Sequence, residues 1–388
     1  LALPPLVALG LASYAFYLWH WPALVLVRYL YLSAEPPVLA TAIALLAALL
    51  LAVLSTRLVE RPLRRRGAEA VLHRRGLFAL SAAVVLTLVG WAQWSVAQEG
   101  FWQRAPGLRQ AVEQASARPE IDATCRTSWR EHGTACRFGA PGEVPQVLLW
   151  GDSHAASLLP GLDLLLQDRG VAGAATVTTG CPPIPGFRRA KHGDDLDCAA
   201  TNAAVLRLFD LQPHAFGTVI LSARWITHVT QANALGEAGL HDPLVDAATG
   251  EPVPLAAAPQ VVEASLGSLV ERITGSGRRV VIVGGIPEQG RDVPALFLAS
   301  RFGALVPFVA PPVQDVRARE APADAILHRL AQRPGVTLVD PVAVVCGRTC
   351  PNSADGHLLY RDGNHLSPYA AQLFVPAMFA GLAFPARP

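Results

Sequence analysis

The stretch Val147-Leu-Leu-Trp-Gly-Asp-Ser-His-Ala-Ala-Ser-Leu-Leu-Pro160 joins a short apolar run to a segment with helical spacing. Residues 146–150 are long enough for a buried strand, and residues 155–167 place several leucines on one helical face. Gly151 and Asp152 form a turn signal between the two. Ser153 is therefore expected where a strand ends and a helix begins.

A serine at such a position has a chemical use. The first N–H groups of a helix have no partner within the helix, and the helix dipole places partial positive charge there. A serine there can attack a carbonyl carbon while backbone N–H groups face the oxyanion that forms. Asp152 and Ser153 are also preferred helix caps, so capping alone is an alternative interpretation.

A second motif, Tyr360-Arg-Asp-Gly-Asn-His-Leu-Ser-Pro-Tyr369, precedes another apolar helical segment. Asp362 and His365 lie three residues apart in it. A nucleophilic serine needs a base, and the base needs a group that fixes its tautomer. Together the two motifs predict a catalytic site in which His365 is the base for Ser153 and Asp362 orients His365.

These motifs resemble those of known families. The early Gly-Asp-Ser-His and the late Asp-x-x-His are similar to the first and last blocks of SGNH hydrolases, which include GDSL esterases. The segment Ser13-Tyr-Ala-Phe-Tyr-Leu-Trp-His-Trp-Pro22 and the later Val59-Glu-Arg-Pro62 resemble the end of an acyltransferase-3 membrane domain. The combination resembles bacterial membrane O-acetyltransferases that carry a periplasmic SGNH domain and modify lipopolysaccharide O-antigen or other surface glycans.

The resemblance implies further oxyanion donors, because SGNH enzymes also use a glycine and an asparagine. Gly180, in Thr178-Thr-Gly-Cys-Pro-Pro183, matches the glycine block, although an ordinary turn glycine is the alternative. The position of the asparagine block reads Leu221-Ser-Ala-Arg-Trp225 and holds no asparagine. Either Arg224 or Trp225 donates instead, or the N–H groups of Ser153 and Gly180 serve alone. A lost donor costs about 10²–10³ in rate, which favours a slow transferase over a general esterase.

Composition limits the class of protein. The chain has 388 residues, room for two or three domains, with only 16% charged residues and a mean hydropathy of +0.33. The net charge of +2, without a basic groove of interleaved aromatics, argues against nucleic-acid binding. The six cysteines form three pairs that are close in sequence and predict disulfides in an oxidising compartment. These pairs are Cys125–Cys136, Cys181–Cys198 and Cys346–Cys350. Their spacing is not that of a structural zinc site, so no metal is expected.

Three apolar segments, residues 6–32, 37–55 and 76–97, have about the 20 residues that a membrane-spanning helix needs. Seven arginines between the second and third place that loop in the cytoplasm. Everything after about residue 98 is then outside. The chain opens with Leu1, so we expect a fragment that lacks earlier membrane helices. The expected parts are the last two acyltransferase-3 helices (1–66), an arginine-rich loop and a further spanning helix (67–98), a periplasmic linker (99–145) and the SGNH domain (146–388).

Five strand-like runs alternate with helical segments after residue 145. The runs are 146–150, 174–179, 218–223, 279–284 and 336–339, and the helices are 155–167, 198–211, 260–275, 323–332 and 369–382. Alternation of this kind predicts a three-layer α/β domain with a central parallel sheet and ligands at the carboxyl ends of its strands. Two insertions, 226–259 and 286–315, are expected to shape a substrate groove. Their neighbouring aromatic side chains form either a sugar-stacking surface or core: Trp225, His228, Phe297, Phe302 and Phe308.

The preferred hypothesis is an O-acetyltransferase acting on a cell-surface glycan. A carbohydrate esterase with the same triad and a non-catalytic glycan-binding module are the alternatives. The resemblance implies no cofactor bound to the SGNH domain, and acetyl-CoA as the ultimate donor through the missing membrane helices. The implied partners are the glycan acceptor, the lipid bilayer and the rest of the acyltransferase-3 domain. The implied location is the bacterial inner membrane, with the SGNH domain in the periplasm.

Overall fold

A computed structural model of the chain describes residues 4–32, 36–63, 73–100, 105–117, 135–142, 144–191, 194–231, 243–303 and 305–384. The chain forms two compact units, described here separately. One comprises Leu1–Gln110 with Leu296–Phe308, and the other comprises Ala111–Ala295 with Val309–Pro388.

The first unit is helical, and its helices coincide with the three predicted apolar segments. They are α1 (Pro4–Tyr31), α2 (Val38–Ser55) and α4 (Arg74–Ala97), and α2 continues through a π-helical turn (Thr56–Glu60) into α3 (Arg61–Leu63). Small residues at four-residue spacing, Ala44, Ala48 and Ala52, are buried where α2 packs on α1. Small side chains let two helices approach closely.

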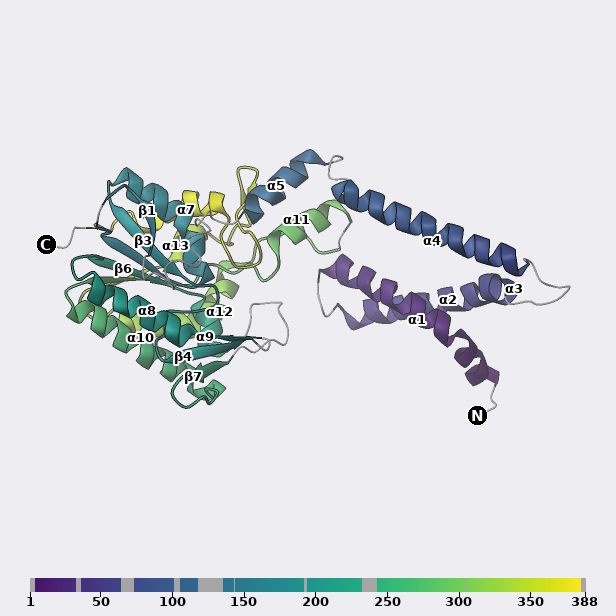
Figure 1. Ribbon diagram of the computed structural model, residues 1–388, viewed down its shortest axis with the longest axis horizontal. Helices are drawn as coiled ribbons and strands as arrows, with labels where there is room; N and C mark the ends of the chain where they lie inside the picture. Colours follow the sequence, from purple (N-terminus) through teal and green to yellow (C-terminus); the bar gives the residue numbers. More distant parts are fainter. Residues whose placement is uncertain are drawn as a thin grey trace. The chain divides into compact units, whose positions relative to one another are not determined.

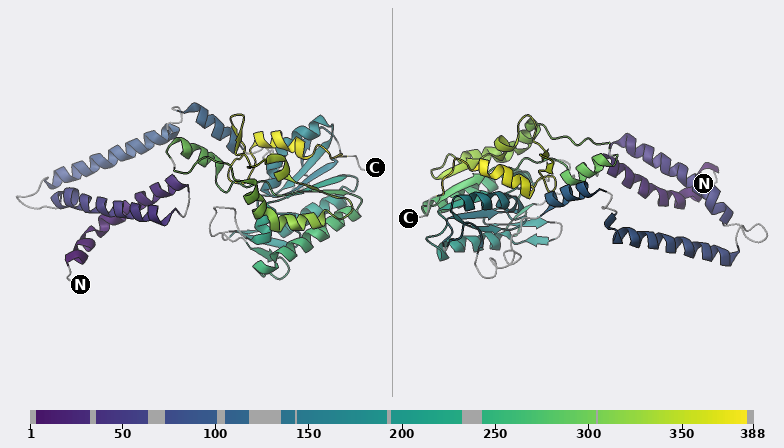
Figure 2. Two further views of the ribbon diagram at one scale, coloured as in Figure 1. Left: turned by 180° about the vertical axis from the view of Figure 1, so that it is seen from behind. Right: turned by 90° about the horizontal axis from the view of Figure 1, so that it is seen from above.

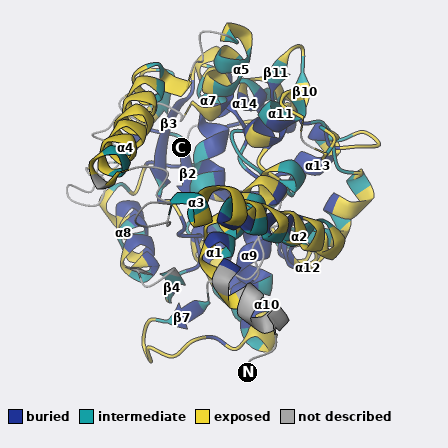
Figure 3. Cartoon of the chain, turned by 90° about the vertical axis from the view of Figure 1, so that its right-hand side faces the viewer, coloured by how far each residue is buried: buried dark blue, intermediate teal, exposed yellow. Residues whose placement is uncertain are grey.

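Two stretches in this unit are long and apolar enough to cross a membrane, Val38–Leu63 and Arg75–Ala97. α1, which contains the first predicted span, is not one of them. α4 is exposed along nearly its whole length, as its colouring in Figure 3 shows. The unit also includes most of α11 (Val293–Arg301), and α5 (Pro106–Ser116) spans the boundary between the two units.

The second unit is built on a six-stranded sheet in the order β1-β3-β2-β6-β8-β9. The five predicted strands are β2 (Val147–Gly151), β3 (Ala172–Val177), β6 (Thr218–Ser222), β8 (Arg279–Val283) and β9 (Val336–Val339). They are mutually parallel, but the edge strand β1 (Cys136–Gly139) runs antiparallel to β3, so the sheet is mixed rather than parallel throughout. β1 escaped prediction because it has only four residues, one of them a charged arginine.

Helices cover both faces of this sheet (Figures 1 and 2). α7 (Ser153–Asp168) and α14 (Pro368–Met378) pack together on one face. A Cβ on Gly161 of α7 would collide with the carbonyl oxygen of Ala371 in α14, so only glycine permits this close approach. The other face carries α8 (Cys198–Leu211), α10 (Ala258–Gly275) and α12 (Val313–Leu330). The unit therefore has the predicted three layers.

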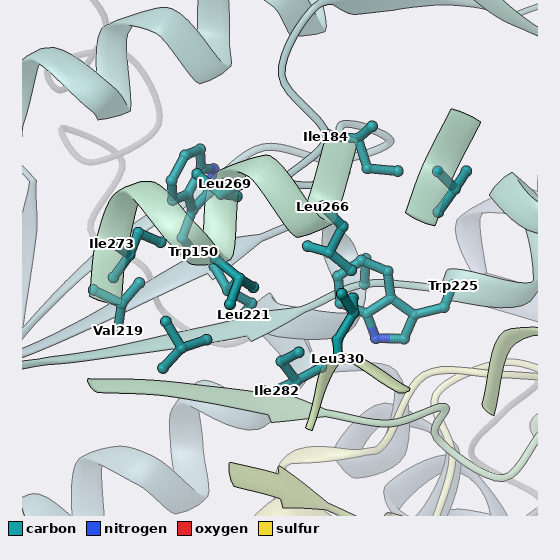
Figure 4. Close-up of a cluster of buried hydrophobic side chains, with 14 of the residues drawn as sticks. Trp150, Ile184, Val219, Leu221, Trp225, Leu266, Leu269, Ile273, Ile282 and Leu330 are labelled. Carbon is teal, nitrogen blue, oxygen red and sulfur yellow. The ribbon is translucent and has the colours of Figure 1, made fainter. Parts of the chain in front are cut away.

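The main core lies between the sheet and the second helical layer. Trp150, Leu221 and Ile282 extend from three neighbouring strands toward buried residues of α10, such as Leu266 and Leu269 (Figure 4). These three residues are paired in register on adjacent parallel strands and so share one face of the sheet. The strands are continuously apolar because helices cover the other face as well.

Short elements fill the two predicted insertions. Residues 226–259 contribute most of α9 (Trp225–Thr230) and the strand β7 (Leu244–Asp246). β7 pairs with β4 (Phe187–Lys191), which pairs with β5 (Asp194–Leu196). Residues 286–315 contain α11. A small hairpin, β10 (Ser353–Ala354) with β11 (His357–Leu358), and the helix α13 (Pro341–Val345) precede the C-terminal motif. α12 begins at Val313 rather than at 323, because it accommodates Pro322 within its length.

Two of the expected disulfides are present. Cys181 is bonded to Cys198 and Cys346 to Cys350, with Cα–Cα distances of 5.1 and 4.3 Å. The first ties the loop after β3 to the start of α8. The expected partner of Cys136, Cys125, lies outside the residues that the structure describes.

Candidate active site

Ser153 is the first residue of α7, directly after the turn that follows β2. Asp152 caps the helix, and its Oδ1 accepts a hydrogen bond of 2.8 Å from the His154 N–H. Gly151 leaves no room for a side chain, since a Cβ there would collide with the carbonyl oxygen of Ser222 in β6. The turn is thus fixed by a glycine that lets two strands approach and by an aspartate that caps the helix.

Three predicted residues form one hydrogen-bonded chain. The Nε2 of His365 is 2.7 Å from the Oγ of Ser153. Its Nδ1 is 2.7 Å from Oδ2 of Asp362. With Nδ1–H donating to the carboxylate, Nε2 carries the lone pair and accepts from the Ser153 hydroxyl. A base hydrogen-bonded to the serine and oriented by a carboxylate is the arrangement that activates a serine nucleophile.

The Asp362 carboxylate is held by its own turn. Its Oδ1 accepts from the N–H groups of Asn364 and His365, each at 2.9 Å. Burial opposes its ionisation, but the hydrogen bond and charge of His365, with these two N–H groups, outweigh burial and hold the pKa of Asp362 well below its usual value. Asp362 is therefore ionised at neutral pH and can stabilise an imidazolium at His365.

A neighbouring loop supports this turn from outside. The N–H of Gln289 donates to the carbonyl oxygen of Gly363 at 2.7 Å, and the N–H of Val293 donates to that of Asp362 at 3.3 Å. Within the turn, the N–H of Arg361 donates to the carbonyl oxygen of His365 at 3.0 Å. The position of His365 therefore depends on the loop after β8 as well as on its own motif.

Asp152 has a larger role than helix capping. Its side chain is buried, and Oδ2 accepts from the Arg224 N–H at 3.0 Å and lies 3.6 Å from Nε2 of His228. Burial opposes ionisation, but His228, His154 and the Arg224 N–H outweigh it and hold the pKa of Asp152 well below its usual value. Burial lowers the pKa of His228, so this imidazole is neutral. Asp152 thus attaches the β6–α9 turn to the serine turn.

Gly180 lies beside the serine turn. The N–H of Thr178 donates to the carbonyl oxygen of Gly151 at 3.0 Å, which brings the loop after β3 to the carboxyl end of β2. Gly180 has φ of +78°, a backbone conformation that favours glycine. Its carbonyl oxygen accepts from Nη1 of the buried Arg189 at 3.2 Å, and its neighbour Cys181 is in a disulfide. The loop that carries this candidate oxyanion donor is therefore fixed on both sides.

The other candidate donors are engaged elsewhere. The Nε of Arg224 donates to Glu288 at 2.6 Å, and Arg319 contacts the second oxygen of the same carboxylate at 2.8 Å. Burial opposes ionisation of Glu288, but the two arginines outweigh it and lower its pKa. The guanidinium of Arg224 thus belongs to a cluster of three charges in which the buried Glu288 carboxylate lies between two partly buried arginines. The indole N–H of Trp225 donates to the carbonyl oxygen of Val283 at 2.7 Å, so this side-chain donor is already paired.

For two of the aromatic residues that were expected either on a sugar-stacking surface or in the core, the structure shows the core alternative. Trp225 and His228 are each only 1% exposed and belong to the interior of the second unit. The reason is that α9, which carries both, packs against α10 and α12. Phe297 and Phe308 make an edge-on ring contact of 5.6 Å in the first unit, where Phe302 is exposed.

Two residues of the site were quoted within the motifs but given no role. His154 is buried, and its Nε2 lies 3.2 Å from Oδ1 of Asn364. One indication of them was present in the sequence: His154 directly follows Ser153, and Asn364 directly precedes His365. Sequence reasoning missed the pair because nothing in either motif shows that the two side chains meet.

Comparisons with known proteins place the chain in a family. The model of the family "SGNH domain (fused to AT3 domains)" matches residues 124–379. The O-acetyltransferase OatA of Staphylococcus aureus strain NCTC 8325 is 37% identical over 92 residues, and OatA of strain MRSA252 is 35% identical over 92 residues. Each alignment covers 23% of this chain and only 15% of OatA.

Among solved structures, the periplasmic domain of the lipopolysaccharide acetyltransferase of Salmonella ser. Paratyphi A aligns over 72% of this chain and 94% of that chain. Its sequence identity is 15% and its TM-score 0.43. The relation is established by the family model instead, since that model matches more than half of the chain. The chain belongs to the family of SGNH domains fused to AT3 domains, which has O-acetyltransferases among its relatives.

Proposed function

We propose that this chain is an O-acetyltransferase that places acetyl groups on hydroxyls of a cell-surface glycan, lipopolysaccharide O-antigen or similar. The observation that carries the proposal is the hydrogen-bonded chain from Ser153 through His365 to Asp362, with both distances at 2.7 Å. The O-acetyltransferases among its relatives support the acetyl group as the one transferred.

The first half of the reaction forms an acetyl-enzyme. The Oγ of Ser153 attacks the carbonyl carbon of the acetyl donor, and its proton passes to Nε2 of His365. Asp362 stabilises the imidazolium. The tetrahedral intermediate collapses, the bond from the acetyl carbon to the donor's leaving group breaks, and the leaving group takes the proton from His365.

The second half transfers the acetyl group to the glycan. A glycan hydroxyl gives its proton to His365, and its oxygen attacks the acetyl-serine carbonyl carbon. The bond to Ser153 Oγ then breaks, and the serine recovers its proton from His365. In both halves the oxyanion accepts hydrogen bonds from the N–H groups of Ser153 and Gly180, at the helix start and in the loop fixed by Arg189.

The donor and the setting are also part of the proposal. The acetyl group comes ultimately from acetyl-CoA through the remainder of the acyltransferase-3 membrane domain. The catalytic unit then lies in the periplasm of a multi-pass inner-membrane protein. Two observations on the described residues support this setting: two helices apolar enough to span a membrane, and the disulfides Cys181–Cys198 and Cys346–Cys350.

The test is acetyl-enzyme formation. The full chain in detergent micelles is incubated with 4-nitrophenyl acetate, an activated acetyl ester, and examined by intact mass. We expect a mass increase of one acetyl group that is absent in Ser153→Ala. Ser157→Ala is the matched control, because Ser157 lies one turn later in α7 with its hydroxyl bonded to the His154 carbonyl oxygen. It should acetylate like the wild type.

Adding glycan separates transferase from esterase. Acetylated glycan is the product of a transferase, whereas free acetate at an unchanged rate is the result for a carbohydrate esterase. The proposal would be refuted if the folded wild-type chain bound glycan but formed no acetyl-enzyme. That result is the one expected of a non-catalytic glycan-binding module.

A further inference from the structure

The side chain of His154 is a buried imidazole beside the proposed base. Only 1% of His154 is exposed, and its ring centroid lies 4.8 Å from that of His365 at an interplanar angle of 58°. Its Nε2 is 3.2 Å from Oδ1 of Asn364, a residue that is itself 5% exposed. Its Nδ1 is buried and has no hydrogen-bond partner among the residues that the structure describes.

The surroundings keep His154 uncharged. Burial lowers its pKa to about 4, the charges of His365 and Arg224 act in the same direction, and Asp152 and Glu288 oppose them. A neutral imidazole has one N–H. Because Nε2 faces the oxygen of the Asn364 amide, the proton belongs on Nε2, and this N–H donates to Asn364.

Asn364 links His154 to the turn that carries the base. It stands between Asp362 and His365, and its own N–H donates to Oδ1 of Asp362. His154 directly follows Ser153 in α7. The hydrogen bond from His154 to Asn364 therefore joins the turn that carries the nucleophile to the turn that carries the base, beside the hydrogen bond between the reacting groups themselves.

We infer that His154 is a positioning residue that sets the distance between Ser153 and His365. This inference rests on the proposed function and deepens it. A neutral donor suits the position for two reasons. A side chain without a donor would leave the buried oxygen of Asn364 unpaired. A permanently charged lysine or arginine would repel the imidazolium that His365 becomes during the reaction.

The test compares two amides of different reach. In His154→Gln the amide nitrogen can occupy nearly the position of Nε2, whereas in His154→Asn it reaches only the position of Nδ1. We expect His154→Asn to lower kcat for 4-nitrophenyl acetate about 10–100-fold with KM nearly unchanged, because small displacements of a reacting group cost about that much. His154→Gln should recover most of the loss.

A double-mutant cycle with Asn364→Ala tests the route of the effect. If His154 acts through Asn364, the double variant with His154→Asn should be no slower than the slower single variant. Fully additive losses, or acetylation of His154→Asn at the wild-type rate, would overturn the inference. His154→Phe keeps a ring without a donor and serves if the Asn variant does not fold; it should be as slow. A wild type that forms no acetyl-enzyme refutes the proposed function instead.

Discussion

The Nε2 of His365 lies 2.7 Å from the Oγ of Ser153, although the two residues are 212 positions apart in the chain. Each stands just before or at the start of a helix that covers the same face of the sheet. Since a hydrogen bond across such a separation depends on the whole intervening fold, its geometry is the strongest indication that the pair acts together.

Asp362→Asn should lower the turnover of an acetyl ester by about 10⁴-fold, the order found when a triad aspartate becomes asparagine. The amide oxygen takes the Oδ1 position, which accepts two backbone N–H groups, so the amide NH2 faces Nδ1 of His365 and donates to it. The imidazole proton then lies on Nε2, and His365 loses the lone pair that accepts from Ser153. Asp355→Asn, an exposed aspartate of the preceding hairpin, is the control and should keep its activity. Equal activity of the two variants would exclude Asp362 from the mechanism.

Gly180→Ala keeps the backbone N–H of residue 180 but displaces it, because alanine disfavours the φ of +78°. If that N–H holds the oxyanion, ester turnover should fall by about 10²-fold, the cost of a displacement of about 1 Å. The substitution should also lower stability by about 1–2 kcal/mol, because φ is +78° at this position. Gly186→Ala is a matched control, since Gly186 has φ of +89° and open space around it. It should lose similar stability, measured by denaturant unfolding, without losing activity. Equal losses of activity in the two variants would mean that Gly180 matters only for the backbone conformation and not for binding the oxyanion.

Glu288→Gln should be destabilising, by about 3 kcal/mol, because it leaves the partly buried guanidinium groups of Arg224 and Arg319 without the buried carboxylate that pairs with them. The measurement is the free energy of unfolding in denaturant. Glu263→Gln provides the comparison. It removes the carboxylate from an exposed pair with Arg329 and should change little. A small loss of stability in Glu288→Gln would mean that water already solvates the charges of Arg224 and Arg319.

Glu320 should make the protein less stable as the pH rises. Burial raises its pKa to about 8, with the nearby Glu288 adding to the effect. The carboxyl group is neutral in both states below its unfolded pKa of about 4.3. Between that value and about 8 the unfolded state ionises first, so stability falls with rising pH. Glu320→Gln should therefore reduce the decline in Tm from pH 5 to 8; an identical decline would contradict the raised pKa.

The grouping of Ser153, His365 and Asp362 could be predicted from the sequence, but the contacts that hold these residues in place could not. Ser153, Asp362 and His365 lie in short motifs whose residue types and spacing indicate a nucleophile, a base and an orienting carboxylate. The capping of α7 by Asp152 was equally local. The contacts of Asp152 with Arg224 and His228 join positions that only the sheet brings together, so no local pattern reveals them.

The fold shows the same division. Continuous apolar runs predicted the parallel strands because burial on both faces demands them. Strand β1 lies at the sheet edge and is only partly buried, so its residues need not all be apolar. The charged Arg137 interrupts the apolar pattern by which the other strands were predicted. For Trp225 the sequence left two alternatives open, a sugar-stacking surface and the core. The burial of Trp225 follows from the packing of α9 on α10 and α12, which the sequence does not display.

The contact between Gly161 and Ala371 has a mechanical consequence. Gly161 is about 12 Å along α7 from Ser153, at 1.5 Å per residue, and Ala371 lies in the first turns of α14, shortly after His365. This contact sets the separation of α7, which begins at Ser153, from α14, which begins shortly after His365. Adding one methyl group to Gly161 would push α14 away from α7, so the distance between Ser153 and His365 is sensitive to a change made two helical turns away.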